Sequence, residues 1–377
     1  MKKAGVAGSV CLDINPVFRA GQPVWLEEGK QTDLDDMRIT LGGCVGNTGL
    51  ALYRLGLPVK VFCKVGNDSL GSFVNEMLRN SGIEAVVERS DEKSSASVII
   101  SPPGKDRMIL HKSGASQTIT ENDIPDDFFS GMSLFHFGYP PKMKRLWADN
   151  GTGMAKLLER VHANGVATSV DMCMPNAGDS ADSLTSFLRH TDIFLPSYEE
   201  MLRLLRPDEY ERVNRIAAGN NLIEYIDERT IAEIAEWALG MGVHIILLKL
   251  GKKGLYLRTG DKASSVPGLE LGSEWNGREL WMAPKLIRKP VSTIGAGDTA
   301  IAGFLASVLS SYDPELAMSV ASCTAAECIE SSDRGHNMPS LDVIRETAVS
   351  DYKQEMLSVG ITGWERRGKV LLGPADK

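Results

Sequence analysis

The sequence predicts an α/β protein with a doubly wound, mostly parallel sheet flanked by helices and a small β lid beside it. Three observations predict this. Short β-rich runs alternate with helical ones along most of the chain, which is typical of parallel strands joined by crossover helices. The run 244–248 (HIILL) is almost wholly apolar, as expected for a strand covered on both faces. Two polar segments interrupt the alternation and belong to neither pattern.

The alternation assigns the elements in order. We expect strands at 4–10, 59–65, 133–137, 167–172, 193–195 and 244–248, and helices at 70–80, 157–163, 199–205 and 231–239. The interrupting segments are 14–40, which is polar and contains two prolines, and 95–111, which has a turn signal at 102–106. We therefore assign 1–13, 41–94 and 112–365 to the core, and 14–40 and 95–111 to the lid. The segments 206–229 and 261–284 have the character of insertions, and their role is left open.

Composition excludes several classes of protein. The 377 residues carry 41 Lys and Arg against 49 Asp and Glu, so the formal net charge is 41 − 49 = −8, which argues against a nucleic-acid partner. No apolar run approaches the roughly 18 residues of a membrane span, and the first ten residues lack a signal peptide. The six cysteines form no CxxC and the six histidines form no metal-binding pair. We expect a cytoplasmic protein with reduced thiols, no membrane partner and no transition-metal site.

The stretch Gly295-Ala-Gly-Asp298 opens an apolar helix. Glycines allow a ligand to approach the backbone, and the start of a helix offers unpaired N–H groups and a partial positive charge to an anion. An acid at this place has two interpretations. It is a helix cap, or it is a base that accepts a proton from a hydroxyl attacking a bound phosphoryl group.

Two further stretches are suited to a polyol. Gly42-Gly43 is followed by Asn47 and then by a helix that ends at Gly56; the glycines would let a polyol approach the main chain, and an Asn side chain both donates and accepts hydrogen bonds. Asp13 follows the first strand, where open α/β sheets bind ligands. The alternative for the glycine stretch is an ordinary loop before a packed helix. The alternative for Asp13 is a solvated acid at the end of a strand.

Taken together and in this order, these stretches resemble the PfkB carbohydrate kinase family, which has the ribokinase-like fold. Three more motifs agree with that family over nearly the whole chain: Val65-Gly66-x-Asp68-x-x-Gly71, Lys249-Leu-Gly-x-Lys-Gly254, and Asp333-Arg-Gly335 before Pro339.

The resemblance implies a role for each matching residue. Asp298 would be the catalytic base, and the N–H groups of Gly295, Ala296 and Gly297 would form the anion hole. Asp13, Gly43, Asn47 and Asp171 would bind the acceptor. Lys249, Gly251, Gly254 and Thr324 would border ATP, and Mg²⁺ would arrive with ATP and be held through water by Glu200.

Several positions depart from the family pattern. Ser292 stands where an acid usually helps hold a monovalent cation, which argues against such a cation, and Ser197 stands where an Asn usually precedes Glu200. Cys11 and Cys44 argue against ribose as the acceptor. Asp171 is present, but Cys173 and Pro175 replace the Asn and Arg that follow it in 2-keto-3-deoxygluconate kinases. Tyr139 follows the strand expected at 133–137. We expect it either to border the sugar or to pack in the core.

The leading hypothesis is an ATP-dependent kinase that phosphorylates a hydroxyl of a small sugar or polyol. Phe18 and Trp25 in the lid keep a nucleoside kinase of the same fold as an alternative. A non-catalytic sugar-binding regulator is the third, although such a protein would not need Asp298. The acceptor, the hydroxyl that is phosphorylated and the oligomeric state are left open; the apolar residues of 14–40 permit a homodimer through the lid.

Overall fold

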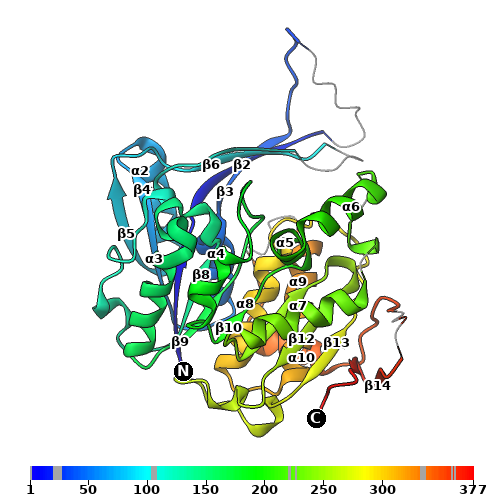
Figure 1. Cartoon of the computed structure of the whole chain (residues 1–377). Helices are drawn as coiled ribbons and strands as arrows, with labels where there is room; N and C mark the ends of the chain where they lie inside the picture. The colour runs from blue at the N-terminus through cyan, green and yellow to red at the C-terminus, as the bar shows by residue number, and fades with distance from the viewer. Residues whose placement is uncertain are drawn as a thin grey trace.

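The computed structural model describes residues 2–19, 28–102, 108–219, 222–225, 227–331, 337–357, 360 and 362–377. Trp25, most of the turn predicted at 102–106 and the Asp333–Gly335 motif lie outside these residues. Within them, the chain builds a large sheet with helices on both faces and a smaller sheet that projects from one end (Figure 1).

The large sheet has 11 strands among the described residues. In spatial order they are β14 (Glu365–Arg367), β15 (Val370–Leu372), β13 (Glu279–Met282), β12 (Leu255–Thr259), β11 (Ile245–Lys249), β10 (Ile193–Phe194), β9 (Ala167–Val170), β8 (Met132–Gly138), β1 (Lys3–Gly8), β4 (Val59–Gly66) and β5 (Glu84–Ser90). From β11 to β5 every neighbouring pair is parallel, while β11 to β14 pair antiparallel. The predicted doubly wound, mostly parallel sheet is therefore confirmed.

Two layers of helices cover this sheet. On one face lie α1 (Leu50–Arg54), α2 (Ser69–Ser81), α8 (Ala296–Leu309), α9 (Pro314–Glu330) and α10 (Leu341–Val349); on the other lie α3 (Lys144–Ala163), α4 (Asp182–Leu188), α5 (Tyr198–Leu205), α6 (Pro207–Ala217) and α7 (Glu228–Gly240). Strand β11 shows why both layers are needed. Ile245 and Leu247 pack in one apolar cluster, while Ile246 and Leu248 pack in the other, as the apolar run 244–248 predicted.

The smaller sheet has four strands among the described residues, in the order β3 (Asp36–Gly42), β2 (Cys11–Val17), β6 (Ala96–Ile100) and β7 (Met108–Lys112). Its two outer pairs are antiparallel, and the central pair β2–β6 is parallel. The predicted small β unit is thus present, built from both interrupting segments. Strand β2 begins at Cys11 and β3 ends at Gly42, so Asp13 belongs to this sheet and does not merely follow β1.

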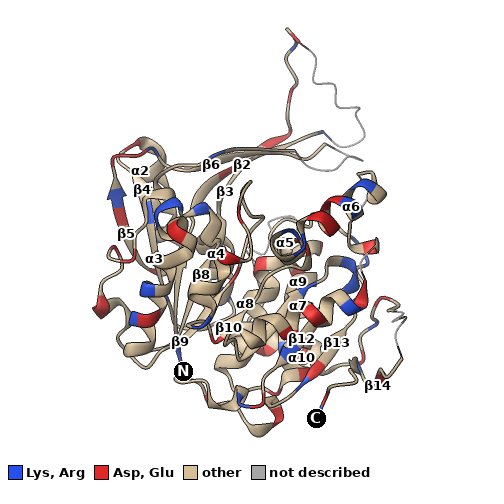
Figure 2. Cartoon of the chain, in the orientation of Figure 1, with Lys and Arg blue, Asp and Glu red and all other residues tan. Residues whose placement is uncertain are grey.

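The two predicted insertions differ in structure. The first contains α6, whose exposed face carries acids and bases that are mixed in Figure 2. The second supplies β13, which pairs with β12 inside the large sheet and contains the buried Trp281; Trp275, in the turn before β13, is also buried. This second segment is therefore an integral part of the core. No helix in the described parts of the chain has the length and apolarity needed to cross a membrane.

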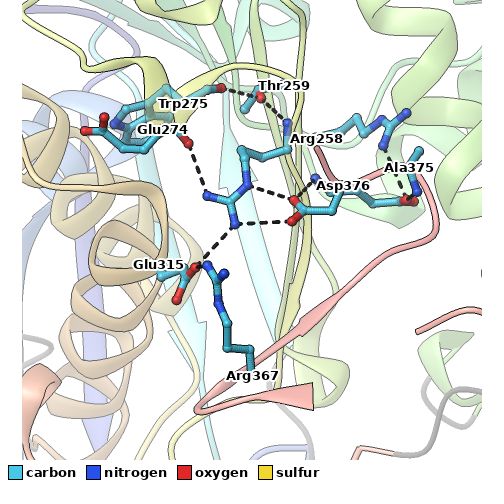
Figure 3. Close-up of polar contacts among 10 residues, drawn as sticks. Arg258, Thr259, Glu274, Trp275, Glu315, Arg367, Ala375 and Asp376 are labelled. Atoms are coloured by element: carbon cyan, nitrogen blue, oxygen red, sulfur yellow. Dashed lines mark hydrogen bonds and ion pairs between the residues drawn. The ribbon is translucent and has the colours of Figure 1, made fainter. Parts of the chain in front are cut away.

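The C-terminal residues close the antiparallel end of the large sheet. Arg278, which is 6% exposed, donates from Nε to Asp376 Oδ1 at 2.8 Å and from Nη2 to Glu315 at 3.3 Å. Asp376 Oδ1 also accepts from the Glu279 backbone N–H at 2.9 Å, and Arg367 pairs with Glu315 (Figure 3). These contacts attach β14 and β15 to the body of the protein.

Candidate active site

The candidate site lies where the parallel strands of the large sheet end and helix α8 begins. Tyr139 follows β8, Asp171 follows β9, and Lys249 is the last residue of β11. Because the carboxyl ends of parallel strands meet at one edge of a sheet, these three side chains converge. The single-turn π-helix η1 (Val45–Gly49) brings Asn47 to the same place, as its contact with Asp298 shows.

Helix α8 places Asp298 in its first turn. Gly295 is the N-cap and has φ +80°, a left-handed conformation that suits glycine, and it has no side chain with which to cap the helix. The rest of α8 is apolar and buried, which fixes the direction of its N-terminus. The Asp298 side chain is 7% exposed and turns toward other elements of the fold.

The partners of Asp298 come from both halves of the chain. Asn47 Nδ2 donates to Oδ2 at 2.9 Å, and the Thr48 hydroxyl lies 3.4 Å from Oδ1. The Tyr139 hydroxyl lies 2.6 Å from Oδ1 and 2.7 Å from Oδ2. The two stretches that the sequence marked for polyol and phosphate chemistry are therefore in direct contact, although they are 251 positions apart.

Lys249 and Asp171 form a buried ion pair beside this carboxylate. Lys249 Nζ donates to Asp171 Oδ1 at 2.6 Å and to the Leu195 carbonyl at 2.7 Å. The aliphatic part of Lys249 passes close to Gly297, where an added Cβ would lie 3.7 Å from Lys249 Cδ. This cation thus lies between the start of α8 and the end of β9.

Burial and like charges set the protonation of the site. Burial raises the pKa of Asp298, and hydrogen bonds from Tyr139 and Asn47 together with the charge of Lys249 offset part of that rise. Burial also raises the pKa of Asp171, and Lys249 opposes the rise while the Glu200 carboxylate adds to it. The acids around Lys249 raise its pKa despite its own burial, so this lysine remains a cation. The site is therefore a buried cluster of acids beside the Lys249 ammonium group.

The small sheet brings Asp13 and Gly43 to the rim of the same region. Asp13 is buried, and the Cys11 thiol donates to its Oδ1 at 3.1 Å. A side chain at Gly42 would collide with the Asp13 carboxylate, which explains the first glycine of the pair. Gly43 has φ +74°, and an added Cβ would lie 2.6 Å from the Ser9 carbonyl, which explains the second.

The residues predicted to border ATP are less closely grouped. Gly251 and Gly254 flank the 3₁₀ turn η6 (Gly251–Lys253) that follows β11, both with positive φ, so the turn begins two residues from Lys249. Thr324 is fully buried in α9, donates its hydroxyl to the Val320 carbonyl and packs against Gly303 of α8. The structure thus gives Thr324 a packing position, and its role toward ATP stays a prediction.

Glu200 has a local partner that the sequence analysis did not foresee. The Ser197 hydroxyl accepts from the Glu200 N–H at 3.3 Å, and Glu200 Oε2 accepts from the Ser197 N–H at 2.7 Å, which is a capping box at the start of α5. Its charge still acts on Asp171, Lys249 and Asp298. In the described residues, no group of three His, Cys, Asp or Glu side chains is arranged to hold a metal ion. Mg²⁺ bound through phosphates and water needs only one or two carboxylates, so Glu200 fits that role.

Three residues of the site were not assigned a role from the sequence. Thr48 and Cys44 lie beside Asn47, and the Cys44 thiol is fully buried, its pKa raised by burial and by Asp298 and Asp171. Tyr139 was noted only as a neighbour of the sugar or of the core. Its position directly after a strand was the one available signal, since carboxyl ends of strands carry the functional groups in this class of fold.

Comparison with known proteins identifies the family of the chain. Residues 6–341 match the pfkB family of carbohydrate kinases. The chain belongs to that family. A sugar kinase of Archaeoglobus fulgidus, itself uncharacterized, is 26% identical over 77% of this chain and 98% of its own length. A 5-dehydro-2-deoxygluconokinase of Clostridium botulinum is 23% identical over 94% of this pfkB chain and 95% of its own.

Solved structures show the same fold. Ribokinase of Arabidopsis thaliana, complexed with ribose and ATP, superposes with a TM-score of 0.67 at 18% identity, over 93% of this chain and 99% of that one. A nucleoside kinase of Methanocaldococcus jannaschii superposes with a TM-score of 0.64 at 19% identity, over 92% of this chain and 98% of that one. The predicted family and ribokinase-like fold are confirmed.

Proposed function

We propose that this pfkB family protein transfers the γ-phosphoryl group of ATP to a hydroxyl of a small sugar or polyol. The observation that carries the proposal is the contact between Asn47 and Asp298 at the start of α8. It joins a polyol-type hydrogen-bonding group, a buried carboxylate and the N-terminus of an apolar helix at one point. A helix cap alone would need neither the burial of the carboxylate nor its partners on other elements.

In the reaction, the oxygen of the acceptor hydroxyl forms a bond to the γ-phosphorus, and Asp298 accepts the proton of that hydroxyl. The bond between the γ-phosphorus and the oxygen that bridges it to the β-phosphate breaks. ADP and the phosphorylated acceptor leave, and Asp298 returns its proton to solvent. The N–H groups of Gly295, Ala296 and Gly297 stabilise the negative charge on the transferring group. Asp298 must be ionised to act, so its hydrogen-bond donors are part of the mechanism.

Other residues bind the two substrates. Asp13, Gly43, Asn47 and Asp171 orient the acceptor, and Lys249, Gly251 and Gly254 border the phosphates of ATP. Glu200 would hold Mg²⁺ through water, and the ion would neutralise charge on the phosphates. Since Lys249 pairs with Asp171, the cation lies where the phosphate and acceptor sites meet.

The curated relatives suggest which acceptors to try first. They include a 2-dehydro-3-deoxygluconokinase of Bacillus subtilis, 24% identical over 71% of this chain, and a fructokinase of Rhizobium leguminosarum, 25% identical over 71%. The test is a coupled assay of ADP formation with Mg²⁺ over a panel of sugars, deoxygluconate-type acids, inositols and nucleosides. Turnover with one sugar or polyol supports the proposal, and turnover with a nucleoside alone would replace it by a nucleoside kinase. Silence across the panel with ATP bound would point first to an untested polyol and then to a non-catalytic binder.

A homodimer through the small sheet is the second part of the proposal. Ile39 on β3 and Met108, Ile109 and Leu110 on β7 are exposed apolar side chains on its outer strands, which supports pairing there. Light scattering of the wild type and of Ile109→Glu tests it. A wild-type dimer that the substitution converts to a monomer supports this interface, and a wild-type monomer contradicts it.

A further inference from the structure

Tyr139 makes the shortest contacts to the proposed base. Its hydroxyl lies 2.6 Å and 2.7 Å from the two oxygens of Asp298, so its one proton is shared across the carboxylate. Burial and the neighbouring carboxylates raise the pKa of the Tyr139 phenol, so the group stays protonated and acts as a donor. The contact is therefore a charge-assisted hydrogen bond, which is stronger than a neutral one.

The backbone of Tyr139 is held in an unfavourable conformation. Its φ is +63°, in the left-handed region that residues other than glycine, asparagine and aspartate rarely adopt. It caps the 3₁₀ turn η4 (Pro140–Lys142), and the Lys142 N–H donates to its carbonyl at 2.9 Å. Such a conformation persists only where the surroundings impose it, and it is concentrated at functional sites. Here it turns the side chain that follows β8 onto Asp298.

The other groups facing Asp298 do not replace this donor. Asn47 donates to Oδ2 at 2.9 Å, whereas Thr48 at 3.4 Å from Oδ1 is too distant for a strong bond. Glu200 of α5 acts on Asp298 with like charge, and Asp171 after β9 and the Cys44 thiol before η1 belong to the same cluster. Lys249 attracts Asp298, but its ammonium group is hydrogen-bonded to Asp171 and to Leu195. Without the Tyr139 hydroxyl, the buried Asp298 carboxylate would keep one short hydrogen bond, the one from Asn47, and would still lie among other acids.

We infer that Tyr139 is a positioning residue for the reaction proposed above: its hydroxyl keeps Asp298 ionised and oriented, so that a carboxylate oxygen is ready for the acceptor hydroxyl. The inference rests on the proposed function, because it needs Asp298 to be the base. When the acceptor binds, the Tyr139 proton settles on one oxygen and leaves a lone pair of the other for the acceptor.

The test is the pH profile of kcat/KM for Tyr139→Phe with the acceptor that the wild type phosphorylates. The acid limb should move to higher pH by about one to two units, because a lost hydrogen bond to a charged group makes protonation of Asp298 easier. Near the alkaline plateau, the variant should recover most of its activity. Phenylalanine keeps the ring and the backbone, so packing changes little.

Tyr256→Phe is the matched control. The Tyr256 hydroxyl donates to the buried Glu279 carboxylate at 2.7 Å, between β12 and β13, and its charged neighbours Glu279, Arg258 and Glu236 do not belong to the site. This variant loses an equivalent tyrosine–carboxylate bond, so it should lose stability while the acid limb stays in place. If the acid limb of the kcat/KM profile did not move in Tyr139→Phe, the inference would be contradicted, and Tyr139 would have a role in packing alone.

A second measurement separates this inference from the proposed function. Infrared difference spectra of the wild type against Asp298→Asn follow protonation of the Asp298 carboxyl without any turnover. The pH at which half of the Asp298 carboxyl is protonated should rise in Tyr139→Phe. It should fall when position 139 carries 3-fluorotyrosine, whose hydroxyl is a stronger hydrogen-bond donor. If the wild type phosphorylated no acceptor, the proposed function would fail. The pH midpoints of Asp298 protonation would still show whether the Tyr139 hydroxyl stabilises the ionised Asp298. If Tyr139→Phe did not fold, the fluorinated protein alone would decide, and an unchanged midpoint there would overturn the inference.

Discussion

Two opposing effects act on the ionisation of Asp298, burial and hydrogen bonding. A base must be ionised to accept a proton, yet burial favours the neutral acid, and the Glu200 charge acts in the same direction. The donors Asn47 and Tyr139 and the start of α8 act the other way. Several elements at once therefore favour the ionised form of the proposed base.

Asp298→Asn should reduce kcat by roughly 10²- to 10⁴-fold, because an amide cannot accept the proton of the acceptor hydroxyl. Binding of ATP and of the acceptor, measured by calorimetry, should change little, because the amide has nearly the same shape. The control is Asp342→Asn, which alters an exposed acid in the first turn of α10. Turnover at the wild-type rate in Asp298→Asn would mean that another group is the base.

The short strand β10 is stabilised mainly by the residue before it. Asp192 Oδ2 accepts from the Thr168 N–H on β9 at 2.8 Å and contacts His162 Nε2 of α3 at 2.9 Å. The Asp192 carbonyl accepts from the His244 and Ile245 N–H groups beside β11, both at 3.0 Å. With only two residues in β10, this one side chain and its carbonyl supply much of the connection between β9 and β11.

Asp192→Asn should lower the free energy of unfolding by about 2–3 kcal/mol at neutral pH, since hydrogen bonds to a buried charge are lost. Burial acts to raise the pKa of Asp192, but the hydrogen bonds with His162 and Thr168 and the His244 imidazole 3.4 Å away overcome it and hold the pKa below the ordinary range. A depressed folded-state pKa contributes stability above the unfolded value of roughly 3.9, and this stability is lost as the pH falls below it.

Urea unfolding between pH 3 and pH 7 measures this effect. The difference between the wild type and Asp192→Asn should be constant above about pH 5 and should shrink below about pH 4. Asp208→Asn, at an exposed position in the first turn of α6, is the control and should lose at most about 1 kcal/mol, the usual contribution of an exposed acid at a helix start. A gap that did not change with pH would assign the loss to packing instead of charge.

Elements with strong local patterns were predictable, and those fixed by distant partners were not. The helix expected at 199–205 and the strand at 244–248 agree with α5 and β11 to within one residue, because periodicity and apolar content mark them. Strands β14 and β15 have three residues each, too few for any pattern; the pairing of β15 with β13 and of β14 with β15 defines them. The same holds in the site. The contact of Asn47 with Asp298 follows from motif order, whereas the Tyr139 contact depends on a left-handed backbone that no spacing reveals.

Over the whole molecule, the chain beyond the family match completes the large sheet. The match ends at residue 341, while α10, β14, β15 and the Asp376 contacts follow it. Asp376 meets Arg278 and the Glu279 N–H, both close to the start of β13 (Figure 3). The large sheet of this protein thus includes strands that lie beyond the residues matched by the family.

Asp376→Ala should lower the free energy of unfolding by roughly 2–4 kcal/mol, because the buried Arg278 guanidinium would keep only Glu315 as a charged partner. Chemical denaturation measures the loss, and kcat/KM should stay unchanged under native conditions, since the contact is remote from Asp298. Asp261→Ala is the control: it removes an exposed pair with Lys377 at 2.7 Å and should cost much less stability than Asp376→Ala, because solvent screens an exposed pair. An equal loss in both variants would contradict the role given to Asp376.

The contact between Asn47 and Asp298 also orders events during synthesis. A ribosome that adds about 5–20 residues each second reaches Asp298 roughly 12–50 s after Asn47, given the 251 positions between them. Throughout that interval the proposed acceptor-binding half exists without the proposed base. The growing chain can therefore gather its first strands well before the proposed base is synthesised.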